Sequence, residues 1–304
     1  MELVLETFGL CKRYKNNIAL ENVNLRVGKG EIFGLIGQNG AGKTTLMRIV
    51  AGIQEPSAGT FTLFGASSAA KGIYGARRRM GGIIETPSLQ ANLTAEQNLK
   101  AQCILRGCPS YDSVEELLRY VGLYDVKGRE VKDMSLGMRQ RRAIACALIG
   151  EPDFLMLDEP INGLDPSGII EIRELILKLN RERKVTVLIS SHILSELSKL
   201  ATNYGFMNKG HLVEEISAER LNELCKKKTL IRVSNTTKLP ALFDGKGLSY
   251  KILSPHGAEL YSDIAVGELS GMIATAGETL LDFRVEEEDL ETYYMNVVGG
   301  EKNV

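Results

Sequence analysis

A short glycine-rich segment near the N-terminus constrains the fold of this chain more than any other feature. Residues 37–45 read GQNGAGKTT and fit the pattern G-x-x-x-x-G-K-[ST]. An apolar stretch at residues 32–36 precedes the segment, and a helical pattern at residues 45–50 follows it. Glycines let the backbone curl so that successive N–H groups face a phosphate, and the start of the helix adds its positive dipole end. The segment therefore predicts a buried strand, a phosphate-binding loop and a helix, in that order.

The chemistry of this loop predicts a bound nucleoside triphosphate. Lys43 can reach the β- and γ-phosphates, and the Thr44 hydroxyl can bind Mg²⁺. The alternative is an ordinary glycine-rich turn before a helix, but the strand, the fixed positions and the helix together favour nucleotide binding. We expect the cofactors ATP and Mg²⁺, with ATP bound by Gly37, Asn39, Gly40, Ala41, Gly42, Lys43, Thr44 and Thr45.

Two carboxylates follow a second strongly apolar strand pattern. Residues 154–157 are apolar, and Asp158 and Glu159 come directly after them. Because ligands bind at the carboxyl ends of central parallel strands, we expect both side chains beside the phosphate-binding loop. Asp158 can hold Mg²⁺, and Glu159 can orient and deprotonate an attacking water. The alternative, a solvated acidic turn, fits poorly with so apolar a strand.

Two more candidate residues lie next to predicted strands. His192 follows the apolar pattern of residues 185–190, and there it can donate to a phosphate or play a structural part. Tyr14 lies between residues 3–10 and 18–27, whose alternating patterns predict half-buried strands. Its ring can stack on an adenine or simply pack over a hairpin, and the nearby phosphate loop favours stacking.

Ser135 and Gly137 stand at the start of a predicted helix. Such residues are often only a cap, yet a helix start can also bind a phosphate through its free N–H groups. Asp165, followed by Pro166, predicts another helix start, and its capping role does not exclude a functional one. Helical patterns after Thr94 and near residues 114–121 predict a helical lobe inserted into an α/β core.

Length and composition bound the remaining possibilities. The 304 residues suffice for one large domain and one small one. A formal net charge of −1 gives no reason to expect nucleic-acid binding, and no apolar run reaches the length of a membrane helix. The acidic N-terminus lacks a signal-peptide pattern, so we expect a cytosolic protein.

The last quarter of the chain has a different pattern. Residues 229–297 predict a β-α-β-β-α-β succession followed by a helix, which suggests a small ferredoxin-like α+β domain. We therefore expect a first domain over residues 1–224 and an accessory domain over residues 225–304. No chemistry is identifiable in the second.

The ordered motifs of residues 2–215 resemble those of the ATPase subunit of an ATP-binding cassette (ABC) transporter. Residues 134–138 are similar to the LSGGQ signature of that family at Ser135 and Gly137, and depart from it at the other three positions. The resemblance implies an α/β fold: a P-loop NTPase cassette with a RecA-like parallel-sheet core, an N-terminal antiparallel β subdomain and an inserted helical lobe. It also implies roles for Tyr14 at the adenine, Asp165 at a partner cassette and His192 at the γ-phosphate.

Glu85 is the informative departure from the family. The family usually has glutamine at the matching position, in a loop that faces the active site and the transmembrane subunit. A carboxylate there adds negative charge near Mg²⁺, so we count Glu85 with Thr44 and Asp158 as a candidate metal ligand. This variant, the signature, the chain length and the tail at residues 291–295 resemble exporters and immunity transporters for bacitracin and lantibiotic peptides.

The resemblance implies hydrolysis of ATP to ADP and phosphate, coupled to transport. Glu159, Lys43 and His192 would be the catalytic residues, and each ATP would lie between two cassettes. A second copy or a paralogue is then required, together with a separate permease that holds the chain at the inner face of the membrane. Two alternatives stay open: a soluble cassette ATPase acting on ribosomes or DNA, and a regulatory module without turnover.

Overall fold

The computed structural model describes residues 2–15, 17–85, 90–225, 228–262, 264–286 and 290–299. Within it the chain packs as two compact units, one up to Ala218 and the other from Glu219 onward. The predicted domain boundary, between residues 224 and 225, falls at the end of a helix of the second unit. The sequence pattern also predicts a strand end at residues 85–88, a solvated basic cluster at residues 226–228 and an acidic helix start at residues 286–288. Residues 86–88, 226–227 and 287–288 of these three segments lie outside the described residues.

The first unit begins with an antiparallel sheet. The strand order is β2-β1-β5-β6, and β3 pairs with β1. The strands are β1 Leu3–Tyr14, β2 Asn17–Val23, β3 Arg26–Gly28, β5 Ala58–Leu63 and β6 Ala66–Ser67. The single strand expected at residues 18–27 is wrong, because it is interrupted after Val23. There Asn22 has a φ of +52°, and the Asn24 carboxamide accepts from the backbone N–H of Gly9 at 2.8 Å.

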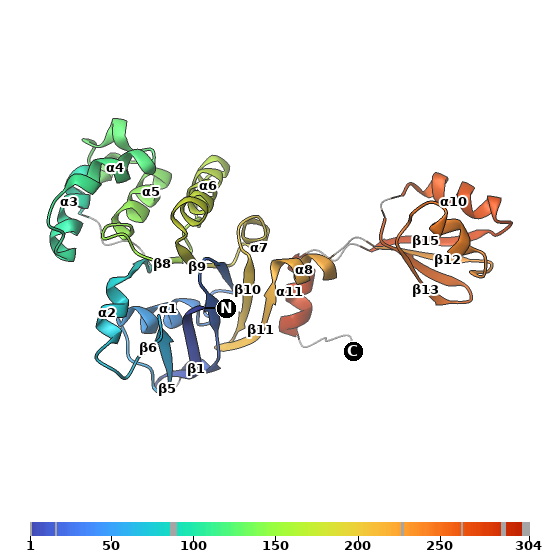
Figure 1. Ribbon diagram of the computed structural model, residues 1–304, viewed down its shortest axis with the longest axis horizontal. Helices are drawn as coiled ribbons and strands as arrows, with labels where there is room; N and C mark the ends of the chain where they lie inside the picture. The colour runs from blue at the N-terminus through green and yellow to red at the C-terminus, as the bar shows by residue number, and fades with distance from the viewer. Residues whose placement is uncertain are drawn as a thin grey trace. The chain divides into compact units, whose positions relative to one another are not determined.

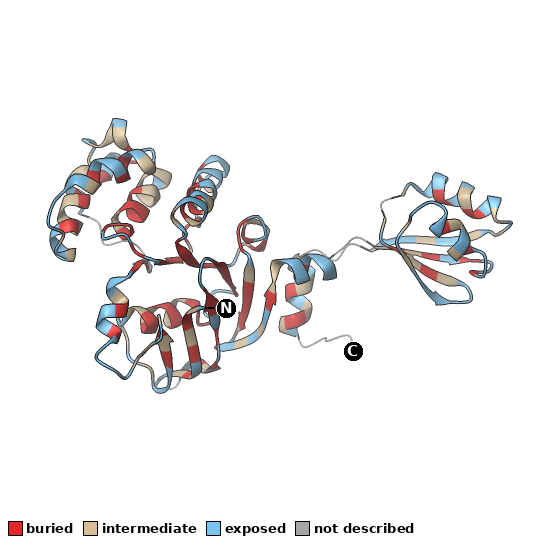
Figure 2. Ribbon diagram, in the orientation of Figure 1, coloured by how far each residue is buried: buried red, intermediate tan, exposed pale blue. Residues whose placement is uncertain are grey.

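The core of the first unit is a mixed six-stranded sheet of order β11-β10-β4-β9-β8-β7. All neighbours in it are parallel except β10 and β11. Its strands are β4 Ile32–Ile36, β7 Met80–Ile83, β8 Phe154–Asp158, β9 Thr186–Ser191, β10 Asn203–Asn208 and β11 His211–Ser217. Every residue of β4, β8 and β9 is buried (Figure 2), which explains their continuous apolar sequences.

Helices surround this sheet and build a separate lobe. They are α1 Lys43–Ala51, α2 Ile73–Arg78, α3 Ala95–Arg106, α4 Asp112–Tyr120, α5 Leu136–Ala147, α6 Pro166–Arg183 and α7 Leu194–Leu197, with short 3-10 turns at Tyr124–Val126 and Val131–Asp133. α3, α4 and α5 pack together beside α6 (Figure 1) and form the predicted helical lobe. A capping box, which the spacing of Thr94 and Gln97 predicts, begins α3: Thr94 Oγ1 accepts from the Gln97 N–H at 3.2 Å and Gln97 Oε1 accepts from the Thr94 N–H at 2.9 Å.

The second unit is a small α+β structure with its own core. Its elements are α8 Ala218–Leu224, β12 Lys228–Val233, α9 Leu239–Asp244, β13 Tyr250–Ser254, β14 Gly257–Leu260, α10 Val266–Thr275, β15 Leu280–Glu286 and α11 Leu290–Gly299. The sheet is antiparallel, in the order β13-β14-β12-β15. Side chains such as Ile231, Phe243 and Leu269 are buried in its core. The architecture of both units confirms the predicted class, an α/β P-loop cassette followed by a small α+β domain.

Candidate nucleotide site

The loop between β4 and α1 needs glycine for steric reasons. Gly42 has a φ of +106°, and a Cβ there would lie 2.5 Å from the Ala19 carbonyl oxygen. At Gly37 a Cβ would lie 2.6 Å from the Met207 carbonyl oxygen, although its φ is unremarkable. Gly40 also has a positive φ, +84°, but open space around it. Gly37 and Gly42 therefore let the loop pack against neighbouring backbone, and the positive φ of Gly40 and Gly42 lets it turn.

A pocket of about 480 Å³ opens over this loop. Its wall contains most of the residues that the sequence analysis assigned to ATP, together with Glu159 and Arg48. The predicted members are Tyr14, Asn39, Gly40, Ala41, Gly42, Lys43, Thr44 and Thr45. Gly37 lies just beneath, where its carbonyl oxygen accepts from Lys43 Nζ at 2.5 Å. A loop with exposed N–H groups followed by a helix start is suited to a phosphate chain.

Asp158 lies at the carboxyl end of β8, next to the start of α1. Its Oδ2 accepts from the Thr44 hydroxyl at 2.7 Å, and its Oδ1 accepts from the Ser190 hydroxyl at 2.5 Å. The residue is only 7% exposed. A hydroxyl and a carboxylate are hard oxygen ligands, and Mg²⁺ usually takes few protein ligands and completes its shell with phosphates and water. The pair therefore fits Mg²⁺, and no cluster of three or more acidic, histidine or cysteine side chains in the described residues offers another metal site.

Glu159 lies between a cation and an imidazole. Its Oε1 is 3.2 Å from Lys43 Nζ, and its Oε2 is 2.8 Å from His192 Nδ1. The residue has a φ of +48°, a left-handed conformation that is uncommon outside glycine. The structure thus brings together three side chains that are distant in the sequence: Glu159 just after β8, Lys43 at the start of α1 and His192 just after β9. A carboxylate with these neighbours at the mouth of a phosphate site can act as a proton acceptor.

Ser190 is a site residue that the sequence analysis missed. Its hydroxyl donates to Asp158 and accepts from the Glu159 N–H at 2.9 Å, so it ties both carboxylate residues to β9. The strand register places Ser190 directly beside Asp158. The available signal was a hydroxyl residue at the carboxyl end of a predicted central strand, the edge where ligands bind.

Ser135 and Gly137 do not line this pocket. Ser135 caps α5, and its Oγ accepts from the Met138 N–H at 3.2 Å. Asp165 caps α6 by accepting from the Gly168 N–H at 3.2 Å. A hydrogen bond from the Ser167 hydroxyl, followed by that from Gly168, lowers the pKa of Asp165 below its ordinary value. Within one chain, the residues at these helix starts therefore do not line the pocket over the phosphate-binding loop.

Glu85 and Tyr14 both have partners in the structure. The Glu85 carboxylate forms an ion pair with the Arg48 guanidinium, and this hydrogen bond is the main reason that the pKa of Arg48 is raised. The Tyr14 hydroxyl donates to Gln54 Oε1 at 2.6 Å, while 38% of the residue stays exposed. The Lys12 ammonium lies 5.3 Å from the centre of the Tyr14 ring. The tyrosine is therefore held at the pocket wall, and its stacking on adenine stays a prediction.

The mostly parallel sheet, the glycine loop before α1 and the acidic end of β8 define a P-loop ATPase cassette. The family model described as ABC transporter matches residues 20–162. The chain is 40% identical to the bacitracin transport ATP-binding protein BcrA of Enterococcus faecalis, over 99% of this chain and 98% of that one. It belongs to the ABC transporter family and is an ATP-binding ATPase of that family.

Two further comparisons agree. The lantibiotic transport ATP-binding protein SrtF of Streptococcus pyogenes is 42% identical over 73% of this chain and 95% of that one. A dimeric structure of a bacterial ABC transporter cassette covers 70% of this chain and 98% of that one, with 25% identity and a TM-score of 0.64.

None of the helices in the described part of the chain is long and apolar enough to span a membrane.

Proposed function

We propose that this chain is the ATP-hydrolysing subunit of a bacterial exporter for antimicrobial peptides of the bacitracin or lantibiotic kind. The contact of Glu159 with both Lys43 and His192, beside the Asp158–Thr44 pair, carries the catalytic part of the proposal. The full-length similarity to a bacitracin transport ATP-binding protein supports the cargo. The second unit falls within that similarity, so the proposal covers the whole chain.

The proposed chemistry assigns one task to each side chain. Backbone N–H groups of residues 40–45 bind the phosphate chain, and Lys43 binds its outer phosphates. Thr44 and Asp158 would hold Mg²⁺, which when bound supplies positive charge to the oxygens of the transferred phosphoryl group. Glu159 orients the attacking water and accepts its proton, while His192 donates to the γ-phosphate.

The proposal also needs a second cassette. Ser135 and Gly137 begin α5 outside the pocket, so the same helix start of a facing copy or paralogue would complete the site. Asp165 would contact that partner. The dimeric structure of the bacterial ABC transporter cassette described above supports this arrangement. A separate permease would hold the pair at the inner face of the membrane.

Replacing Glu159 by glutamine tests the catalytic assignment. The amide keeps the size of the side chain but cannot accept the proton, so we expect steady-state phosphate release to fall by at least about 100-fold. Equilibrium ATP binding should stay within a few-fold of the native protein. Glu151→Gln is the matched control, because that exposed residue lies near the opposite, amino-terminal end of β8. Unchanged phosphate release in Glu159→Gln would refute the assigned base.

Two rival functions give different results. A regulatory module without turnover would bind ATP but release no phosphate in the native protein. A soluble cassette acting on ribosomes or DNA would show ATPase activity stimulated by nucleic acid. The exporter proposal instead expects that purification of the native chain from detergent-solubilised membranes recovers an integral membrane protein.

A further inference from the structure

Arg48 connects the nucleotide pocket to the segment that follows β7. It lies on α1, five residues after Lys43, and its side chain lines the pocket. Its guanidinium forms an ion pair with the carboxylate of Glu85, two residues beyond the end of β7. The exposed fractions of the two side chains are 29% for Arg48 and 56% for Glu85, so the pair is open to water on the side of Glu85.

The position of Arg48 in the pocket wall places its ion pair with Glu85 at the nucleotide site. The electrostatic influence of Asp158 reaches Arg48 and raises its pKa further, as does that of Tyr14. Arg48 therefore lies within the field of the predicted metal ligand Asp158, and it lines the same pocket as the predicted adenine contact Tyr14. A change in the charge of the pair will be felt by a bound triphosphate, which is itself highly charged.

The backbone at Glu85 is also unusual. Its φ is +63°, a left-handed conformation that costs a non-glycine residue about 1 kcal/mol or more. A residue persists in that conformation when surrounding contacts hold it there. The ion pair with Arg48 is the contact that the described structure gives this side chain.

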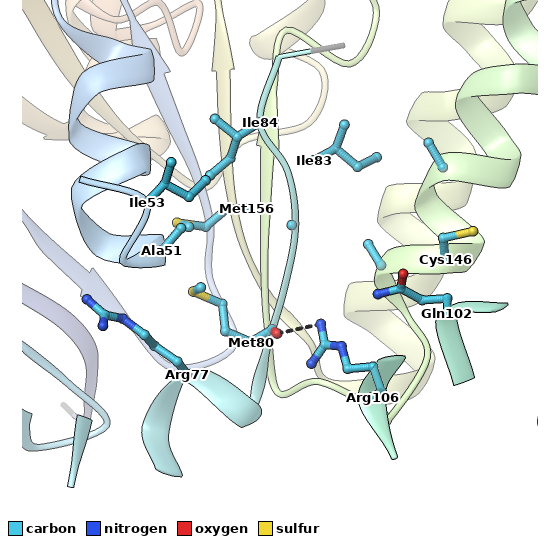
Figure 3. A pocket seen from close by; sticks show the side chains of 13 residues that line it. Ala51, Ile53, Arg77, Met80, Ile83, Ile84, Gln102, Arg106, Cys146 and Met156 are labelled. Atoms are coloured by element: carbon cyan, nitrogen blue, oxygen red, sulfur yellow. Dashed lines mark hydrogen bonds between the residues drawn. The ribbon is translucent and has the colours of Figure 1, made fainter. Parts of the chain in front are cut away.

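The chain just before Glu85 lines one part of a groove of about 460 Å³ (Figure 3). Ile83 and Ile84, just before Glu85, line it together with Ile53 from the turn after α1. Arg106 of α3 donates from Nη2 to the Met80 carbonyl oxygen at 3.0 Å. The Arg48–Glu85 pair thus joins α1 to the segment that also contributes Ile83 and Ile84 to this groove.

We propose that Arg48 is a positioning residue that holds Glu85 and cancels its charge, so that Glu85 joins neither the metal nor the nucleotide while the pair is intact. This inference rests on the proposed nucleotide site. It explains how the chain accommodates a carboxylate where the resemblance led us to expect glutamine. Within the described residues, the pocket then presents to Mg–ATP the carboxylates of Asp158 and Glu159.

The proposal predicts opposite effects of the two single substitutions on the affinity for metal-free ATP. In Arg48→Met the uncompensated Glu85 carboxylate repels ATP, so metal-free ATP binds more weakly. In Glu85→Gln the unpaired guanidinium attracts ATP, so metal-free ATP binds more tightly. Because both side chains are partly exposed and solvent screens their charges, we expect shifts of roughly threefold to tenfold in the dissociation constant. The double variant should return to within about twofold of the native value.

The experiment is an equilibrium fluorescence titration of the full-length chain with a fluorescent ATP analogue in EDTA. The titration is repeated without EDTA and with increasing Mn²⁺. Half-maximal binding of the analogue should need less Mn²⁺ in Arg48→Met than in the native protein. Arg79→Met is the matched control, because it breaks an exposed ion pair with Asp153. Both residues lie at the amino-terminal ends of their strands, β7 and β8, and the nucleotide site lies at the carboxyl ends. The Arg79→Met variant should leave both titrations unchanged.

The outcomes separate this inference from the proposed function. A purely structural pair would make both single variants bind more weakly, and that result, or no shift in either, would overturn the role of Arg48. If the native chain bound no nucleotide, or bound it equally after Lys43→Ala, the nucleotide site itself would be refuted.

Discussion

The two left-handed glycines of the phosphate-binding loop allow a matched test of its geometry. Gly42→Ala places a methyl group 2.5 Å from the Ala19 carbonyl oxygen and 2.8 Å from Leu20 Cδ2, at a φ of +106°. Gly40→Ala adds the same methyl group at a φ of +84° with nothing within 4 Å. Both variants incur the conformational cost, and only Gly42→Ala incurs the steric one.

The magnitudes follow from these two terms. The left-handed backbone costs alanine about 1–2 kcal/mol, offset by about 0.4–1 kcal/mol from the reduced entropy of the unfolded chain. Overpacking against backbone adds about 1–3 kcal/mol at Gly42. We therefore expect Gly40→Ala to lower the free energy of unfolding by about 1 kcal/mol and Gly42→Ala by about 2–4 kcal/mol.

Urea denaturation followed by circular dichroism measures this difference, since the chain has no tryptophan. Because both variants share an unchanged second unit, any difference between them arises in the first. Equal destabilisation of the two variants, or a larger effect at Gly40, would show that the contact with Ala19 does not determine why glycine stands at position 42.

Three other predictions concern single side chains. Ser190→Ala removes the hydroxyl that binds Asp158 and the Glu159 N–H, so the turnover rate should fall roughly tenfold and unfolding should cost about 1–3 kcal/mol less; a fully active variant would contradict this. Thr94→Ala should lower the free energy of unfolding by about 1 kcal/mol in a thermal melt, whereas Thr94→Ser should lower it by almost nothing. Equal losses in the two variants would exclude the capping box. Burial raises the pKa of the Cys146 thiol to about 11, so about one molecule in a thousand is thiolate at pH 8, and mass spectrometry should find iodoacetamide labelling far slower than in urea.

The sequence predicted those parts of the site that follow from local pattern. The strand, loop and helix around Lys43 are confirmed, because glycines in fixed positions before a helix leave few other structures. The acidic end of β8 is where a buried parallel strand should place it. A helix start at Ser135 was likewise readable from its cap.

Contacts between distant segments could not be predicted in this way. The bond between Ser190 and Asp158 depends on the register of β8 against β9, which no local pattern specifies. The pairing of Glu85 with Arg48 depends on how the segment after β7 packs against α1. The interrupted strand after Val23 was missed because alternation continues across Asn24, whose side chain binds backbone instead of continuing the ladder.

The most direct test of the account is equilibrium binding of ATP in the presence of Mg²⁺, measured for the native chain and for Lys43→Ala. Lys43 Nζ is buried at the base of the pocket and lies 3.2 Å from Glu159, so its loss should weaken ATP binding by at least about tenfold. Lys29→Ala, an exposed lysine paired with Glu2 outside the pocket, should bind like the native chain. Equal ATP affinity in the native chain and Lys43→Ala would contradict the assignment of this loop as the site of the triphosphate.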